Sequence, residues 1–206
     1  MAKIFVVSGP SGAGKTSLCK AVLKDLPGIK GSISHTTRPP REGEIDGDDY
    51  WFVAPGTFET MIEEGAFLEW AEVHGYRYGT SQRAVEQCQK DMDLLLEVDC
   101  KGAAHIKKKI PAAVLVFIMT PSVDDLLKRI LRRGPISEEE LIRRMDTARD
   151  EIQQLSYYDY LVVNGSFSEA LQALRSIVLA ERWKRGIWVD PWMQKWIGEI
   201  SCLRNL

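Results

Sequence analysis

The sequence predicts an α/β domain in which a parallel β-sheet is flanked by helices. Four runs of apolar and β-branched residues, at 3–7, 92–99, 113–120 and 160–164, have the composition of buried strands. Segments with helical spacing lie between them. Parallel strands joined through helices of this length imply a doubly wound sheet with right-handed crossovers. The 206 residues are enough for one such domain with a well-buried core.

The first strand runs directly into a glycine-rich loop. Residues 9–16 (Gly-Pro-Ser-Gly-Ala-Gly-Lys-Thr) match the G-x-x-x-x-G-K-[ST] motif in full, and helical spacing follows over 16–25. Glycines let several backbone N–H groups converge on one anion at a helix N-terminus, where the dipole favours negative charge. Lys15 can reach β- and γ-phosphates, and the Thr16 hydroxyl is a hard ligand suited to Mg²⁺. A turn that only caps a helix is the alternative, but the complete motif favours a nucleotide site of the P-loop NTPase type.

The composition is that of a soluble globular protein. Hydrophobic residues make up 45% and charged residues 27%, and no apolar run approaches the roughly 20 residues that span a bilayer. A net charge of −2 argues against a protein that coats nucleic acid. The four cysteines and three histidines lack metal-ligand spacing, so free thiols are expected. The first strand begins within three residues of Met1, which leaves no room for a targeting peptide, and we expect a cytoplasmic protein.

A strand-rich insertion is predicted over residues 32–81. Arg38 and Arg41 lie in a loop where prolines and glycines exclude a regular helix. The elements predicted after it are a strand at 50–53, a short helix at 55–64, a strand at 67–73 and, at 76–81, a turn rich in hydroxyl groups. Arginines beside tyrosines, hydroxyls and Glu69 suit a second phosphorylated ligand, because arginine binds phosphate and a carboxylate accepts bonds from a base. For the two arginines alone, a solvated basic turn is the alternative.

A helix predicted at 81–90 leads to the strand at 92–99, which ends in Glu97 and Asp99. Both carboxylates should therefore lie at the carboxyl edge of the sheet, where ligands bind in open α/β folds. Either could serve the metal or the substrate. A helix at 101–109 precedes the strand at 113–120.

Two arginine-rich helices are predicted before the last strand. One spans 122–133 and is capped by Ser122, and the other opens at Ser137 with a capping box. Arginines concentrate here while the apolar pattern lapses, as expected of a lid that closes on polyphosphate. Surface charge paired with nearby acidic residues is the alternative, and it is favoured for Arg132, Arg143 and Arg149.

The chain ends in a strand at 160–164, an amphipathic helix at 166–184 and a tryptophan-rich tail. Trp188, Trp192 and Trp196 recur every fourth residue behind an Asp190-Pro191 helix start. Three large aromatics on one stripe favour burial against protein. We expect the tail to dock on the chain's own last long helix in preference to that helix in a partner subunit.

Taken together, these residues resemble the guanylate kinase family over roughly residues 3–184. The resemblance is carried, in order, by Ser8–Thr16, Ser34–Glu44, Gly47–Phe52, Phe67–Glu69, Tyr78–Thr80, Leu96–Gly102 and Arg129–Gly134. The second block, Ser-His-Thr-Thr-Arg-Pro-Pro-Arg-Glu-Gly-Glu, is far more specific than the phosphate loop. The resemblance implies transfer of the γ-phosphoryl group of MgATP to GMP or dGMP, giving ADP and GDP or dGDP, in purine nucleotide metabolism.

The resemblance also implies roles for individual residues. The phosphate of GMP would be held by Arg38, Arg41, Tyr50 and Tyr78, and guanine by Ser34, Glu69, Thr80 and Asp99. ATP would be bound by Gly9, Pro10, Ser11, Gly12, Ala13, Gly14, Lys15, Thr16 and Ser17, together with Arg133 and Asn164, and the metal by Thr16. The catalytic residues would be Lys15 and Arg38, with Arg129, Arg133 and Arg144 as lid arginines that clamp the transferring group.

We therefore expect one domain built from four parts. These are a core at 1–31, 82–121 and 157–186, a GMP-binding insertion at 32–81, a lid at 122–156 and the tail at 187–206. Two carboxylates can accept the N1–H and 2-amino donors of guanine, a pair that adenine lacks. No general base is needed, because the attacking phosphate oxygen is already largely ionised near pH 7.

Two alternative functions stay open. One is a kinase for another nucleoside monophosphate, and the other is a non-catalytic guanylate-kinase-like module that binds phosphopeptides. The intact phosphate loop disfavours the second. The expected partners are ATP and GMP or dGMP, in a monomer or a homodimer, with no nucleic acid and no membrane.

Overall fold

The computed structural model describes residues 2–73, 75–88, 92–132, 134, 136–184 and 189–203, without the side chains of 84, 87, 88, 189–192, 202 and 203. Arg133, Trp188 and the side chain of Trp192, which carried sequence predictions, lie outside this description. Within it, no helix is both long and apolar enough to cross a membrane.

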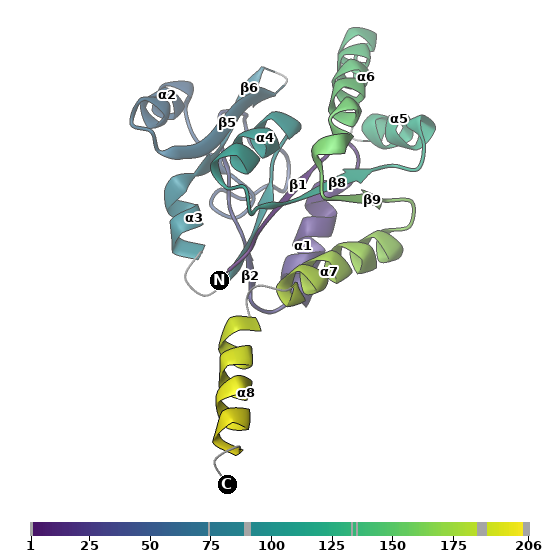
Figure 1. The fold of residues 1–206 in the computed structure, drawn as a ribbon. Helices are drawn as coiled ribbons and strands as arrows, with labels where there is room; N and C mark the ends of the chain where they lie inside the picture. Colours follow the sequence, from purple (N-terminus) through teal and green to yellow (C-terminus); the bar gives the residue numbers. More distant parts are fainter. Residues whose placement is uncertain are drawn as a thin grey trace.

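A five-stranded sheet forms the centre of the molecule (Figure 1). Its strands, in spatial order, are β2 (Ile29–Gly31), β7 (Asp93–Glu97), β1 (Ile4–Ser8), β8 (Val114–Met119) and β9 (Tyr160–Val163). Every neighbouring pair is parallel, which confirms the predicted sheet. β1 is buried along its whole length. The phosphate loop that follows it therefore leaves from the centre of the sheet.

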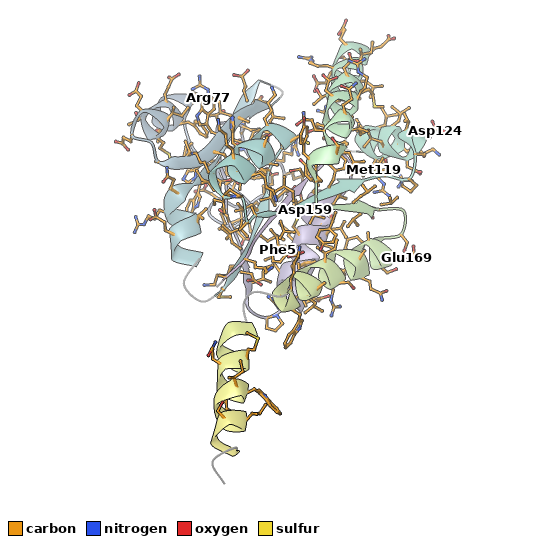
Figure 2. The ribbon with its side chains drawn as sticks, in the orientation of Figure 1. Phe5, Arg77, Met119, Asp124, Asp159 and Glu169 are labelled. Carbon is orange, nitrogen blue, oxygen red and sulfur yellow. The ribbon has the colours of Figure 1, made fainter. Side chains whose placement is uncertain are left out.

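Helices cover both faces of this sheet. On one face lie α1 (Lys15–Asp25) and α7 (Phe167–Trp183), and on the other α3 (Gln82–Cys88) and α4 (Cys100–Lys109). Side chains alternate along β1, so Phe5 and Val7 join the cluster with α1 and α7, while Ile4 and Val6 join the opposite one. Phe5 lies deep in the first of these clusters (Figure 2).

The insertion between β2 and β7 carries a second sheet. Its strands, in spatial order, are β4 (Trp51–Phe52), β3 (His35–Thr36), β6 (Tyr76–Ser81) and β5 (Phe67–Val73), and α2 (Pro55–Glu63) packs beside them. The prediction that 76–81 form a turn is wrong, because β6 pairs antiparallel with β5, with Val73 opposite Tyr76. Gly79 lowers the strand propensity of this segment, but pairing with a neighbouring strand satisfies the backbone N–H and C=O groups and outweighs that effect.

Two helices, α5 (Val123–Leu131) and α6 (Glu138–Gln153), and the 3-10 turn Leu155–Tyr157 connect β8 to β9. Both predicted caps are confirmed, since the hydroxyls of Ser122 and Ser137 each accept a bond from the N–H three residues on. Figure 2 shows Asp124 of α5 on one side of the molecule and Arg77 of the insertion on the other. The helical segment and the insertion thus flank the strand ends from opposite sides.

The tail forms a helix, but not where it was expected to lie. α8 (Val189–Leu203) exposes Met193, Trp196, Ile197 and Ile200 by 39–50%, and in Figure 1 it extends away from the sheet. The predicted docking on α7 is therefore wrong for the described residues. The apolar face of α7 formed by Ala170, Leu174 and Val178 packs against the sheet and α1, so this face is not available to the tail.

Glu181 joins the end of α7 to both the first and the last strand of the chain. Its side chain is only 4% exposed and accepts bonds from Lys3 (2.9 Å), Tyr160 (2.7 Å) and Lys184 (3.0 Å). Burial by itself would raise the pKa of Glu181, but these three donors outweigh it and lower the pKa from 4.5 to about 2. A carboxyl whose pKa is lower in the folded chain stabilises the fold above its ordinary pKa.

We expect Glu181→Gln to lower the free energy of unfolding at pH 7 by roughly 3 kcal/mol, the value of a pKa shift from 4.5 to about 2. This contribution is lost as the pH falls from about 4.5 towards 2, so the wild type and the variant should converge there. Urea unfolding at pH 7 and pH 3 measures both effects. Glu169→Gln, which removes an exposed carboxylate from the same helix (Figure 2), should change stability by less than about 0.5 kcal/mol. Equal losses in the two variants would contradict this assignment.

Candidate active site

The predicted phosphate loop, residues 9–16, lies between the carboxyl end of β1 and the start of α1. Gly9, Gly12 and Gly14 have φ values of 138°, 95° and 92°, a region that favours glycine. A Cβ atom on Gly9 would lie 2.0 Å from the carbonyl oxygen of Ile118, so no larger residue fits beside β8. The loop is therefore built for close backbone approach to an anion at a helix N-terminus.

The loop is braced by two residues from neighbouring elements. The Nδ2 of Asn164, at the end of β9, donates to the carbonyl oxygen of Ala13 (2.8 Å). Arg129 of α5 donates to the carbonyl oxygens of Asn164 (2.7 Å) and Ala13 (3.5 Å). Asn164 was predicted to bind ATP and Arg129 to be a catalytic lid arginine, and the structure places both against the P-loop.

Lys15 and Thr16 make different kinds of contact at the start of α1. The Lys15 ammonium donates to the carbonyl oxygens of Gly9 (2.5 Å) and Pro10 (3.1 Å), within its own loop. The Thr16 hydroxyl donates to Oε1 of Glu97 (2.7 Å) at the end of β7. Of the two carboxylates that end this strand region, Glu97 is thus the one that is hydrogen-bonded to the P-loop threonine. Within the described residues no set of three acidic, histidine or cysteine side chains forms a metal cage.

Two carboxylates, the buried Glu69 and the partly buried Asp99, meet at the N-terminus of α4. Glu69 is 6% exposed and accepts a bond from the Thr80 hydroxyl (2.6 Å), while Asp99 accepts one from the N–H of Gly102 (2.8 Å). A Cβ on Gly102 would lie 2.5 Å from Glu69 Oε2 and 3.1 Å from Asp99 Oδ1. Burial raises the pKa of Glu69 to about 7 and also raises the pKa of Asp99. The pair is therefore a site for a ligand that supplies hydrogen-bond donors.

The insertion brings together the four residues predicted to hold a second phosphate. Arg38, only 8% exposed, donates to Glu44 (2.9 Å) and to the Tyr78 hydroxyl (3.2 Å), and lies over the ring of Tyr50 at 5.5 Å. The backbone N–H of Arg41 donates to the other oxygen of Glu44 (2.7 Å). Glu44 thus holds the basic loop in place from within.

One cavity of about 200 Å³ joins these groups. It is lined by Gly9, Lys15 and Thr16 of the P-loop, by Ser34, Arg41, Tyr50, Glu69 and Tyr78 of the insertion, by Glu97 and Asp99 after β7, and by Arg144, Thr147 and Glu151 of α6. The sequence analysis missed Thr147 and Glu151. Their spacing from Arg144 places them on the same helix face, which was the available signal.

The arginines of α6 divide into one that faces the cavity and others that do not. Arg144 donates to Glu140 (2.8 Å) and has 22% of its side chain exposed. Arg143, 63% exposed, pairs with the same carboxylate (2.8 Å), and Arg149 pairs with Asp146 and Asp150. The prediction of surface ion pairs is confirmed for Arg143 and Arg149.

The fold and the site define a P-loop phosphotransferase in which the phosphate loop and the insertion line one cavity. A family model described as guanylate kinase matches residues 1–181. The chain belongs to the guanylate kinase family, as the resemblance predicted.

Individual relatives agree with this assignment over most of their length. The chain is 49% identical over 179 residues to a guanylate kinase of Syntrophotalea carbinolica, covering 86% of this chain and 85% of that protein. It is 44% identical over 180 residues to a guanylate kinase of Geobacter metallireducens, covering 87% and 89%. A crystal structure of guanylate kinase from Anaplasma phagocytophilum superimposes with a TM-score of 0.76 at 31% identity, covering 89% of this chain and 88% of that one.

Proposed function

We propose that this chain transfers the γ-phosphoryl group of MgATP to GMP or dGMP, giving ADP and GDP or dGDP. Membership of the guanylate kinase family makes it an ATP:GMP phosphotransferase. The observation that carries the proposal is the single cavity in which the P-loop and Lys15 share walls with Glu69 and Asp99. A kinase for another nucleoside monophosphate, or a phosphopeptide-binding module, is not favoured by relatives of this identity.

In this proposal, Glu69 and Asp99 read the guanine edge. Each carboxylate has one donor from the protein, so acceptor capacity remains for the N1–H and the 2-amino group. Adenine offers no such pair of donors, and binding it would leave a buried carboxylate without a partner. The free-energy penalty of that unpaired carboxylate discriminates against AMP more strongly than additional favourable contacts to GMP would. Ser34 and Thr80 complete the guanine site.

Arg38, Arg41, Tyr50 and Tyr78 hold the phosphate of GMP at the other end of the acceptor. Lys15, Arg129, Arg133 and Arg144 act on the phosphates of ATP, which residues 9–17 and Asn164 bind. The reaction needs alignment and charge neutralisation rather than a base, because the attacking phosphate oxygen is already ionised. Closure of the helical segment 122–156 over the cavity would exclude water from the transfer.

The hydroxyl of Thr16 and the carboxylate of Glu97 fit a magnesium site. Both are hard oxygen donors, and they already lie in contact (2.7 Å) beside the position of the β- and γ-phosphates. Mg²⁺ commonly takes one or two protein oxygens and completes its shell with phosphate and water. When bound, it would neutralise charge on the phosphates of ATP. We further propose a cytoplasmic enzyme of purine nucleotide metabolism.

A coupled assay for ADP release from MgATP tests the function. GMP should be the best acceptor, dGMP should be less efficient, and AMP, CMP and UMP should give no more than background. Lys15→Met should abolish transfer while circular dichroism stays unchanged, since the lysine neutralises phosphate charge rather than supporting the fold. Comparable turnover with AMP or UMP would refute the proposed acceptor.

Gly102→Ala should weaken GMP binding without loss of stability. The new Cβ would displace the Glu69 carboxylate, which lies 2.5 Å from its position, whereas alanine favours the helix by up to about 1 kcal/mol. We expect the KM for GMP to rise by roughly 10-fold, the loss of one good hydrogen-bonded pair. Gly56→Ala in α2, where a Cβ meets nothing within 4 Å, is the matched control. An unchanged KM for GMP in Gly102→Ala would argue against the guanine role of Glu69.

Arg144→Ala should lower kcat by roughly 100-fold, as removing one charge-stabilising donor from an active site typically does. The KM for GMP should change little, because the arginine engages the transferring group rather than the acceptor. Arg143→Ala is the matched control, since Arg143 pairs with the same Glu140 but is 63% exposed and lies outside the cavity lining. Similar losses of kcat in both variants would contradict this role, because they would show that activity depends on the ion pairs with Glu140 and not on contact between Arg144 and phosphate.

A further inference from the structure

Glu151 is a carboxylate of α6 that the roles above leave unexplained. Arg144, Thr147 and Glu151 are spaced by three and four residues, so they lie on one face of the helix, and all three line the cavity. Ala148, between them, packs against α5. Glu151 is thus about two helical turns from Arg144 on the same face, at the end of α6 nearer to the sheet.

The surroundings of Glu151 disfavour the charged form of its carboxyl group. Burial raises the pKa of Glu151 to about 7; the Lys15 ammonium lowers it and the Asp99 carboxylate raises it. The thiol of Cys100 and the hydroxyl of Tyr158 also lie within its electrostatic reach. Within the part of the chain that the structure describes, the carboxylate forms no hydrogen bond or ion pair that would offset this desolvation.

Lys15 is the cation best placed to form an ion pair with Glu151. Its ammonium donates to two carbonyl oxygens of its own loop, at 2.5 and 3.1 Å. Phosphate oxygens are stronger acceptors than carbonyls, and an ammonium has three donors, so it can serve phosphate and a carboxylate together. Asp99 also lies near Lys15, but one of its oxygens already caps α4 through Gly102. Glu151 lines the same cavity and, within the part of the chain that the structure describes, neither of its oxygens accepts a hydrogen bond, so both remain available to the lysine.

We propose that Glu151 is a positioning residue for the transfer, whose carboxylate pairs with the Lys15 ammonium when a nucleoside triphosphate fills the P-loop. The pair links α6 to the lysine that lies on the β- and γ-phosphates. Because Arg144 is on the same face of α6, the link brings both cations to the transferring group together. The positive ammonium then lies between the negative phosphate and the negative carboxylate. This arrangement avoids direct repulsion between the carboxylate and the phosphate. The inference rests on the proposed function.

The first test is Glu151→Gln, which keeps the shape of the side chain and removes its charge. We expect kcat to fall about 10-fold or more, with the KM for GMP changed by less than about threefold, because Glu151 orients Lys15 without binding the acceptor. The melting temperature should stay the same or rise, since a desolvated carboxylate is removed. Glu139→Gln, an exposed carboxylate on the same helix, should leave all three quantities unchanged.

The second test observes the Lys15 ammonium directly in the full chain. With Mg²⁺ and a non-hydrolysable ATP analogue, ¹⁵N-lysine NMR should show a slowly exchanging Lys15 ammonium, assigned by its absence in Lys15→Met. Glu151→Gln should broaden or remove that signal, because an unpaired ammonium exchanges its protons faster. This measurement needs no acceptor, so it tests the pair even if GMP proves not to be phosphorylated.

Three results would overturn the inference. One is a kcat for Glu151→Gln within about twofold of the wild type. Another is a fall in melting temperature of more than about 5 °C, which would make the role of Glu151 structural. The third is a Lys15 signal that is the same in the wild type and in Glu151→Gln.

Discussion

The close packing of Gly9 against β8 is the constraint on which the site depends. With the Ile118 carbonyl oxygen 2.0 Å from where a Cβ would stand, the chain can leave β1 only through glycine. The phosphate loop therefore starts at the carboxyl edge of the sheet, where β7 delivers Glu97 and Asp99 and β9 delivers Asn164. Parallel strands end on the same side, so residues far apart in the sequence converge there. The sheet thus places the P-loop, the proposed metal ligands and part of the proposed acceptor site at one edge.

The cations in and beside the cavity are paired with internal groups, which we propose that a substrate replaces. Lys15 bonds to loop carbonyls, Arg38 to Glu44, and Arg144 to Glu140. Each contact offsets part of the cost of holding a cation near a low-dielectric cavity. A phosphate brings more charge than a carbonyl, so it competes well for the same donors. For the carboxylates the sign is opposite: burial raises the pKa values of Glu69 and Asp99, so a ligand that donates hydrogen bonds would stabilise their charged forms.

The helical segment (122–156) and α8 differ in how their apolar side chains are packed. α5 and α6 share a small core of Leu126, Ile130 and Ala148, separate from the two clusters on the sheet. A segment with its own core can move as a unit while its cavity face stays intact, which suits a lid. α8 lies beyond residue 181, where the family match ends, and keeps an exposed apolar face. α8 thus lies outside the part of the chain that the family match covers.

The sequence by itself determined the parallel sheet, the phosphate loop and the helix caps, because each follows from local patterns of apolar spacing, glycine and hydroxyl residues. Tertiary structure decided the rest. It made 76–81 a strand, since β5 supplies the backbone partners that local propensity does not reveal. It also distinguished the two carboxylates at the end of β7 by their hydrogen-bond donors: Glu97 accepts from the Thr16 hydroxyl, and Asp99 accepts from the N–H of Gly102. It also turned Glu151 into the cavity and left the apolar face of α8 exposed, because the direction a helix face takes depends on neighbours distant in sequence.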